Sequence, residues 1–270
     1  MDNRPIGVFD SGLGGLTTVR QLRRQLPGEN IVYFGDTGRV PYGTKSRETL
    51  IKYARQNIRF LLQFDPKAIV VACNSADTVR SVVAQEFDLP ILGVVEPSAH
   101  KAATATRNGR IGLIATPATI RSGVYEPLIH QYGENLEIRT RACPLFVPLV
   151  ENGRTEPGDV VIETVVQEYL QDLKDWGCDT LVLGCTHYPL LNAVIGGFMG
   201  EDTLLINSGA EAARALASYL QQKDLLSGNA EGGKCEYYVS DSTEGFAALA
   251  EHFLKCPMDG TVQQVDIGSY

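Results

Sequence analysis

The sequence predicts an α/β fold of two similar domains with mostly parallel sheets, and two observations support this prediction. Short apolar runs typical of buried strands alternate along the chain with segments whose apolar residues recur at helical spacing. The second observation is an internal repeat: residues 6–11 (IGVFDS) align with 111–116 (IGLIAT), and residues 69–73 (IVVAC) align with 181–185 (LVLGC). We interpret the repeat as a duplicated α/β unit whose two copies face each other across a cleft.

The composition is that of a soluble globular protein. The chain has 270 residues, 44% apolar and 21% charged, which allows one large domain or two medium ones, and the repeat favours two. The net charge of −8 argues against a nucleic-acid-binding surface. The sequence contains no run of about 18 apolar residues, the length that spans a membrane. The N-terminus lacks an apolar signal segment. We therefore expect a cytoplasmic protein that binds neither nucleic acid nor membrane.

The first half of the chain is expected to alternate strand and helix. Glycines at 12, 14 and 15 form a turn before a helix that Pro27 ends, and Ser46 is expected to cap a second helix. The intervening segment, 36–45, is rich in turn residues and is either a surface loop or a loop that covers a substrate. Short apolar strands are predicted at 6–9, 30–35, 69–72 and 91–95, with a domain boundary at 96–97. A helix is expected after Cys73, with apolar residues at 76, 79, 82 and 83.

The second half repeats this alternation. Thr116 is expected to cap a helix that begins near Pro117. Residues 144–153 are expected to be irregular, which places Glu151 in a loop. Further strands are predicted at 137–143, 181–183, 204–207 and 235–239, with helices at 158–174, from 208 to 222, and from a cap at 241–242 to 254. The last sixty or so residues are too few to bury a core alone, so they should pack on one of the two copies.

Two of the six cysteines are placed for chemistry. Cys73 and Cys185 each end a predicted strand beside polar residues, and the carboxyl ends of strands are where ligands bind in open α/β folds. The other four, at 143, 178, 235 and 256, are interpreted as small buried hydrophobes, and no CxxC pair is present. Two thiols that face one ligand from opposite sides favour one reaction: removal of a proton from one face of a carbon and its return to the other.

The thiols need help, because a neutral thiol is a poor base. His187 is a candidate acid that orients or protonates Cys185, two residues before it. The alternative, a structural histidine, is disfavoured by its polar neighbours. Asp10 could assist Cys73 in the same way, or hold a substrate ammonium group.

Polar residues at the same strand ends are candidates for binding a carboxylate. Asn74, Ser75 and Thr186 combine polar side chains with backbone N–H groups at predicted helix starts. The only metal-like spacing is the Cys-x-His of 185 and 187, which is insufficient for a zinc site, so we predict no metal.

Four motifs closely resemble the glutamate racemases of the aspartate/glutamate racemase family. They are VFDSGLGG (8–15), PYG (41–43), ACNSA (72–76) and GCTHYPLL (184–191), they occur in the family's order over nearly the whole chain, and together they are highly specific. The resemblance implies a cofactor-independent isomerase that interconverts L- and D-glutamate and supplies D-glutamate for peptidoglycan of the bacterial cell wall. It also implies a homodimer.

The family's architecture implies two α/β domains related by a pseudo-twofold axis, with the active site in the cleft between them. The first domain would comprise 1–97 and 207–270, and the second 98–206. Cys73 and Cys185 match the catalytic cysteines, one on each face of the α-carbon. Asp10 and His187 match their assisting residues, and Glu151 matches an auxiliary carboxylate. The matching substrate-binding residues are Asp10, Ser11, Tyr42, Gly43, Asn74, Ser75, Thr116, Thr186 and His187.

One departure and two alternatives remain. Ser75 stands where the family usually has threonine, which keeps the hydroxyl and loses a methyl contact. An aspartate racemase would share the paired cysteines, but its second cysteine motif has a glutamate residue at the position of His187. The sequence therefore favours the amino acid glutamate over aspartate as the substrate. A binding or regulatory protein that has lost catalysis on the same fold is disfavoured, because both cysteines and their partners are intact.

Overall fold

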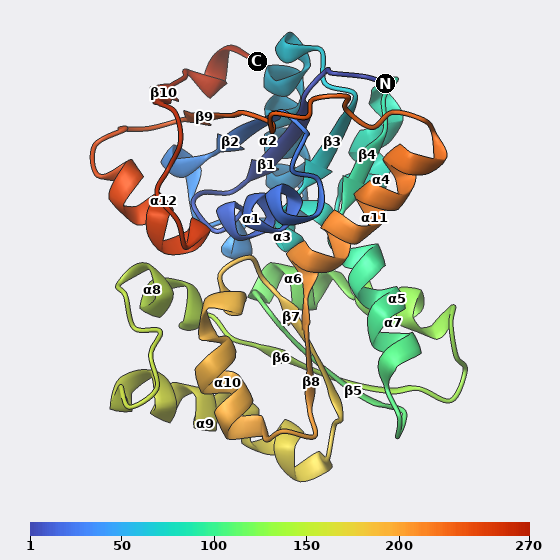
Figure 1. Ribbon diagram of the computed structural model, residues 1–270. Coiled ribbons are helices and arrows are strands. Elements are labelled where there is room, and N and C mark those ends of the chain that lie inside the picture. Colours follow the sequence, from blue (N-terminus) through green and yellow to red (C-terminus); the bar gives the residue numbers. More distant parts are fainter.

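The computed structural model describes residues 1–270 and contains two parallel sheets flanked by helices (Figure 1). We call the six-stranded sheet with its helices the first unit, and the four-stranded sheet with its helices the second unit. The strand order is β10-β9-β2-β1-β3-β4 in the first unit and β6-β5-β7-β8 in the second. The strands are β1 (Ile6–Asp10), β2 (Ile31–Gly35), β3 (Ala68–Val71), β4 (Ile91–Gly93), β5 (Arg110–Ala115), β6 (Glu137–Ala142), β7 (Thr180–Gly184), β8 (Leu204–Asn207), β9 (Cys235–Val239) and β10 (Val262–Gln264). The predicted α/β fold class is confirmed.

The repeat seen in the sequence reappears in the pairing of the strands. β1 pairs with β3 so that Gly7 lies opposite Ile69, and β5 pairs with β7 so that Gly112 lies opposite Leu181. These are the residues that the repeat aligns. The order β2-β1-β3-β4 also corresponds to β6-β5-β7-β8. The two units therefore share topology and register, and β9 and β10 extend the first sheet beyond β2.

Helices lie against both sheets (Figure 1). Two predicted caps are confirmed: Ser46 Oγ accepts a hydrogen bond from the backbone N–H of Thr49, and Thr116 Oγ1 accepts one from that of Thr119. The helices are α1 (Leu16–Gln25), α2 (Arg47–Leu61), α3 (Asn74–Asp77), α4 (Arg80–Val83), α5 (Val95–Ala105), α6 (Pro117–Ser122), α7 (Tyr125–His130), α8 (Phe146–Glu151), α9 (Val160–Trp176), α10 (Asn192–Met199), α11 (Ser208–Gln222) and α12 (Phe246–Leu254). None is both long enough and apolar enough to cross a membrane.

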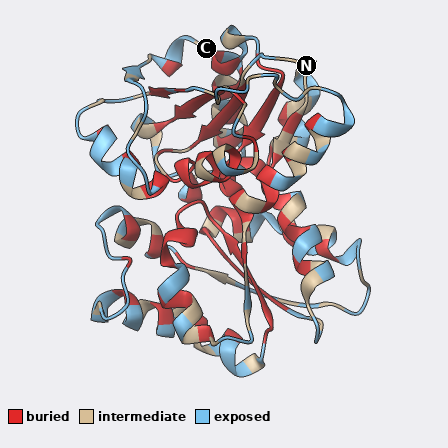
Figure 2. Ribbon diagram, in the orientation of Figure 1, coloured by how far each residue is buried: buried red, intermediate tan, exposed pale blue.

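The core follows the strands. β1, β2, β3 and β7 are buried along their whole length, as expected for parallel strands covered on both faces, while the outer faces of the helices are exposed (Figure 2). One cluster of buried apolar side chains includes Val8 of the first unit and Leu183 of the second. Packing is therefore continuous from one unit to the other, and it fixes how the strand ends of the two sheets face each other.

Glu151 does not lie in a loop, so this prediction was wrong. The segment expected to be irregular contains α8, and Glu151 is its last residue. Pro148 is compatible with this helix. It sits in the first turn of the helix, where its missing N–H would have had no helical partner.

Other local predictions also need correction. The helix expected after Cys73 is divided into α3 and α4, where the hydroxyl of Thr78 donates to the Ser75 carbonyl at 2.7 Å. The strand expected to reach 95 ends at Gly93, and residues 96–97 lie in the first turn of α5. The last helix begins at Phe246, after Gly245 in the left-handed region, rather than at 241–242. The domain limits 1–97 with 207–270, and 98–206, stay a prediction.

Candidate active site

A cavity of about 270 Å³ lies where the carboxyl ends of strands from both sheets meet. The residues that follow β1, β3, β5, β6 and β7 contribute to its wall. Of the predicted site residues, all but Asp10 line it: Ser11, Tyr42, Gly43, Cys73, Asn74, Ser75, Thr116, Glu151, Cys185, Thr186 and His187. Asp10 lies behind the wall, fully buried. The structure thus brings the predicted residues together, while their roles stay predictions.

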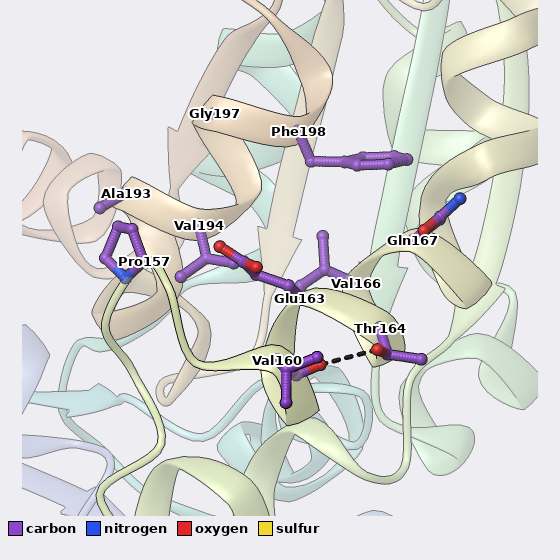
Figure 3. A pocket seen from close by; sticks show the side chains of 10 residues that line it. All are labelled: Pro157, Val160, Glu163, Thr164, Val166, Gln167, Ala193, Val194, Gly197 and Phe198. Atoms are coloured by element: carbon purple, nitrogen blue, oxygen red, sulfur yellow. Dashed lines mark hydrogen bonds between the residues drawn. The ribbon is translucent and has the colours of Figure 1, made fainter.

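Volume alone does not identify a site in this molecule. A larger hollow of about 570 Å³ lies between α9 and α10 (Figure 3), but Glu163 is the only ionisable side chain that lines it. Val166, Val194 and Phe198 make up much of the rest. The smaller cavity is lined by four of the five predicted catalytic residues, which makes it the candidate active site: Cys73, Glu151, Cys185 and His187.

Cys73 and Cys185 reach the cavity from opposite sheets. Cys73 follows β3 of the first unit and precedes α3, and Cys185 follows β7 of the second unit. The two residues are 5% and 6% exposed, so each thiol is shielded from bulk water while it lines the cavity. Because β3 and β7 are equivalent strands of the repeat, the two thiols occupy equivalent places in the two units.

The imidazole of His187 lies between the Cys185 sulfur and the Glu151 carboxylate. His187 Nδ1 lies 3.9 Å from the Cys185 sulfur, and His187 Nε2 lies 3.0 Å from Glu151 Oε1. Burial alone would lower the pKa of His187, but hydrogen bonds to Cys185 and Glu151 outweigh burial and raise the pKa to about 10. The imidazole therefore carries a proton at neutral pH and places a positive charge beside the Cys185 sulfur.

Cys73 has a buried carboxyl group, Asp10, as its neighbour. Burial raises the pKa of the Cys73 thiol, and the nearby Asp10 carboxylate raises it further. Burial also raises the pKa of Asp10, although the charge of His187 and the N–H of Gly12, 3.0 Å from Oδ2, oppose this. Cys73 is consequently a neutral thiol at rest. The two thiols of the cavity thus have different charged neighbours, an imidazolium beside Cys185 and a carboxylate beside Cys73.

The cavity also presents a donor without a partner. Asn74 is 2% exposed, and its Nδ2 has no hydrogen-bond partner, whereas its Oδ1 accepts from the hydroxyl of Tyr125 at 2.7 Å. An unsatisfied buried amide N–H is costly unless a ligand completes it. Nearby, the hydroxyls of Ser75 and Thr116 lie 2.8 Å apart and bridge the two units. These groups are suited to a ligand rich in oxygen atoms, such as a carboxylate.

The loop after β2 is anchored beneath the cavity. Asp36 is fully buried and accepts hydrogen bonds from Arg39 Nε at 2.7 Å, from Ser240 Oγ at 2.7 Å and from the Tyr42 hydroxyl. Because the Tyr42 hydroxyl is already bound, the residue offers its ring and backbone to the cavity. Gly43 next to it contacts the second unit: a Cβ there would lie 2.7 Å from Thr116 Cβ.

The glycine turn after β1 has a similar structural reason. A Cβ on Gly14 would lie 2.2 Å from Thr186 Oγ1 and 2.5 Å from His187 Nδ1. In the same place Thr17 Oγ1 donates to the Thr186 carbonyl at 2.8 Å. The absence of a side chain at Gly14 thus lets the first unit approach the two polar residues that follow Cys185.

Sequence reasoning missed one wall of the cavity. Cys143, Pro144, Val147 and Pro148 line it and make this side largely apolar. Cys143 follows strand β6, so the rule that singled out Cys73 and Cys185 could have found it. Burial raises the pKa of Cys143, which keeps it a neutral thiol. No three His, Cys, Asp or Glu side chains converge in a way that could hold a metal ion.

The chain matches known proteins over most of its length. A family model for Asp/Glu/Hydantoin racemases matches residues 6–216. The chain belongs to this family. A glutamate racemase from Geobacter metallireducens is 46% identical over 265 residues, which covers 98% of this chain and 97% of that protein. The predicted enzyme class of this family member, an isomerase that racemises amino acids, is confirmed.

Solved structures agree with this family membership. Glutamate racemase isoform RacE1 from Bacillus anthracis has a TM-score of 0.93 to this chain, at 38% identity over 98% of each chain. The glutamate racemase from Francisella tularensis, solved in complex with D-glutamate, has a TM-score of 0.91 at 38% identity over the whole of both chains. The match extends over both units, so the cleft between them belongs to the shared fold.

Proposed function

We propose that this racemase interconverts L-glutamate and D-glutamate without a cofactor, with Cys73 and Cys185 as the two acid–base groups. The observation that carries the proposal is the placement of the two thiols, which reach one cavity from equivalent strands of a duplicated unit. The relatives support glutamate as substrate, since the Geobacter metallireducens relative is a glutamate racemase and the Francisella tularensis structure contains D-glutamate.

In the proposed reaction Cys185 acts first as the base, in its thiolate form, beside the protonated His187, and Cys73 is the thiol that acts as the acid. The thiolate removes the α-proton: the C–H bond breaks, an S–H bond forms, and the electron pair stays on the α-carbon. Cys73 then donates its proton to the opposite face. The product is the other enantiomer, with the thiolate now at Cys73. The opposite enantiomer reacts in the reverse order, and proton exchange with solvent restores the first state.

The cavity must hold the substrate and stabilise the carbanion. The free N–H of Asn74 and the hydroxyls of Ser75 and Thr116 are donors for its carboxylates. Asp10, behind the wall, can interact with the ammonium group or exchange a proton with Cys73. Because the α-proton is weakly acidic, fixed donors in a site that excludes water supply much of the stabilisation.

The biological setting is part of the same proposal. Racemisation would supply D-glutamate for bacterial peptidoglycan, in the cytoplasm, by a homodimer. These points rest on the motifs shared with glutamate racemases. Sedimentation velocity of the purified protein tests the dimer, and a monomer at enzymatic concentrations would contradict it.

The test of the function is proton NMR with L-glutamate in deuterated water and no added cofactor. Loss of the α-proton signal together with optical rotation is the expected result. If the α-proton signal and the optical rotation are lost with aspartate but not with glutamate, the substrate is aspartate. If neither amino acid reacts, the protein is a binding protein on a racemase fold. Cys73→Ser and Cys185→Ser should each abolish turnover in both directions. Full activity in either would refute the two-cysteine reaction.

A further inference from the structure

Tyr125 connects the two units at the candidate active site. It is the first residue of α7 in the second unit, and its ring is 1% exposed and packs in an apolar cluster with Val95 and Ala99. Its hydroxyl leaves this cluster and donates to Asn74 Oδ1 at 2.7 Å. Asn74 belongs to the first unit and directly follows Cys73. A side chain of one unit thus binds a cavity-lining side chain of the other.

This hydrogen bond leaves the donor end of the Asn74 amide free. A side-chain amide has an acceptor end and a donor end that exchange places when the group rotates by half a turn. The Tyr125 hydroxyl occupies the acceptor end, and the donor end, Nδ2, is buried without a partner. Burial raises the pKa of Tyr125, so the hydroxyl keeps the proton that it donates.

We infer that Tyr125 is a positioning residue, whose hydroxyl orients the Asn74 amide so that its N–H groups are available to the substrate carboxylate. This inference rests on the proposed function. The bond joins the two units, so Asn74 is held in this orientation only while the units are apposed. The contact between the two units therefore also orients the Asn74 amide as a hydrogen-bond donor. Without the hydroxyl, half a turn of the amide would place its oxygen toward the substrate's negative charge.

The experiment compares three variants in steady-state racemisation of glutamate. Tyr125→Phe keeps the ring and removes the hydroxyl, and we expect kcat/KM to fall about three- to tenfold, mostly through KM. Tyr237→Phe is the matched control, because its hydroxyl donates to Asp259 at 3.1 Å and the residue does not line the cavity. We expect wild-type kcat and KM from this control. The third variant, Asn74→Ala, removes the amide on which Tyr125 acts.

A double-mutant cycle separates positioning from structural support. If Tyr125 acts through Asn74, Tyr125→Phe has no further effect on kcat/KM in the Asn74→Ala background. An equal loss in both backgrounds would overturn the inference, as would an unchanged KM in the single variant. A wild-type protein that does not racemise glutamate would refute the proposed function itself. If the wild type is active and the Tyr125→Phe variant is equally active, only the inference about Tyr125 is refuted, and the proposed function stands.

Discussion

Replacing Glu151 by glutamine removes the carboxylate charge that raises the pKa of His187 and keeps the size of the side chain. Glu151 Oε1 lies 3.0 Å from His187 Nε2, and the Glu151 side chain is 41% exposed, so the pair is screened by water. Two unit charges at this distance in a water-like dielectric interact by about 1.4 kcal/mol, which is equivalent to about one pKa unit. We expect Glu151→Gln to lower the pKa of His187 from about 10 to about 9.

The assay is the pH dependence of kcat/KM for glutamate between neutral pH and the alkaline range. Loss of the His187 proton removes the cation beside Cys185, so activity should fall on the alkaline side. In Glu151→Gln this fall should begin about one pH unit lower. A proton NMR titration of the imidazole gives the same quantity without turnover, with His187→Gln to assign the signal.

The control is Glu168→Gln, which removes a charge from an exposed residue of α9 that does not line the cavity. It should leave the alkaline limb unchanged. If the limb of Glu151→Gln also stays in place, or moves to higher pH, Glu151 does not stabilise the imidazolium. The same coupling affects stability. Because folding raises the pKa of His187 from 6.5 to about 10, this stabilisation is complete below pH 6.5 and is lost as the pH rises through about 10.

Three further substitutions test other parts of the structure. Gly14→Ala places a Cβ 2.5 Å from His187 Nδ1, and we expect kcat/KM to fall about a hundredfold; wild-type kinetics would contradict this account of the glycine. Lys67→Met leaves the buried Glu29 carboxylate without its cation and should lower the free energy of unfolding in urea by about 3 kcal/mol. Asp36→Asn weakens the anchor of the loop after β2 and should raise KM about threefold to tenfold, with an unchanged KM counting against that role.

The positions of the two thiols could be predicted because they depend on local pattern and general geometry. An apolar run followed by Cys73 or Cys185 places a thiol at the carboxyl end of a strand, and parallel strands bring those ends to one edge. The same argument holds for Asn74 and Thr116. Since the repeat is visible in the sequence, it also predicts that Cys73 and Cys185 occupy equivalent positions in the two units.

Contacts between distant segments could not be predicted in this way. Tyr125 and Asn74 are 51 residues apart, and nothing local to either indicates that they meet. The helical state of Glu151 was not predicted either, although Pro148 is tolerated because it lies in the first turn of α8. Phe253 of α12 lies edge-on to His187, with ring centroids 5.3 Å apart. That contact depends on how the C-terminal segment folds back over the first sheet.

The cavity has walls that are alike in backbone and different in charge: an imidazolium accompanies one thiol and a buried carboxylate accompanies the other. Enantiomers have equal free energies in water, so the proposed reaction has an equilibrium constant of one. The specificity constants for L- and D-glutamate must therefore be equal, however different the two walls are. The asymmetry can appear only as a compensation, in which the enantiomer that has the lower KM is turned over more slowly by the same factor.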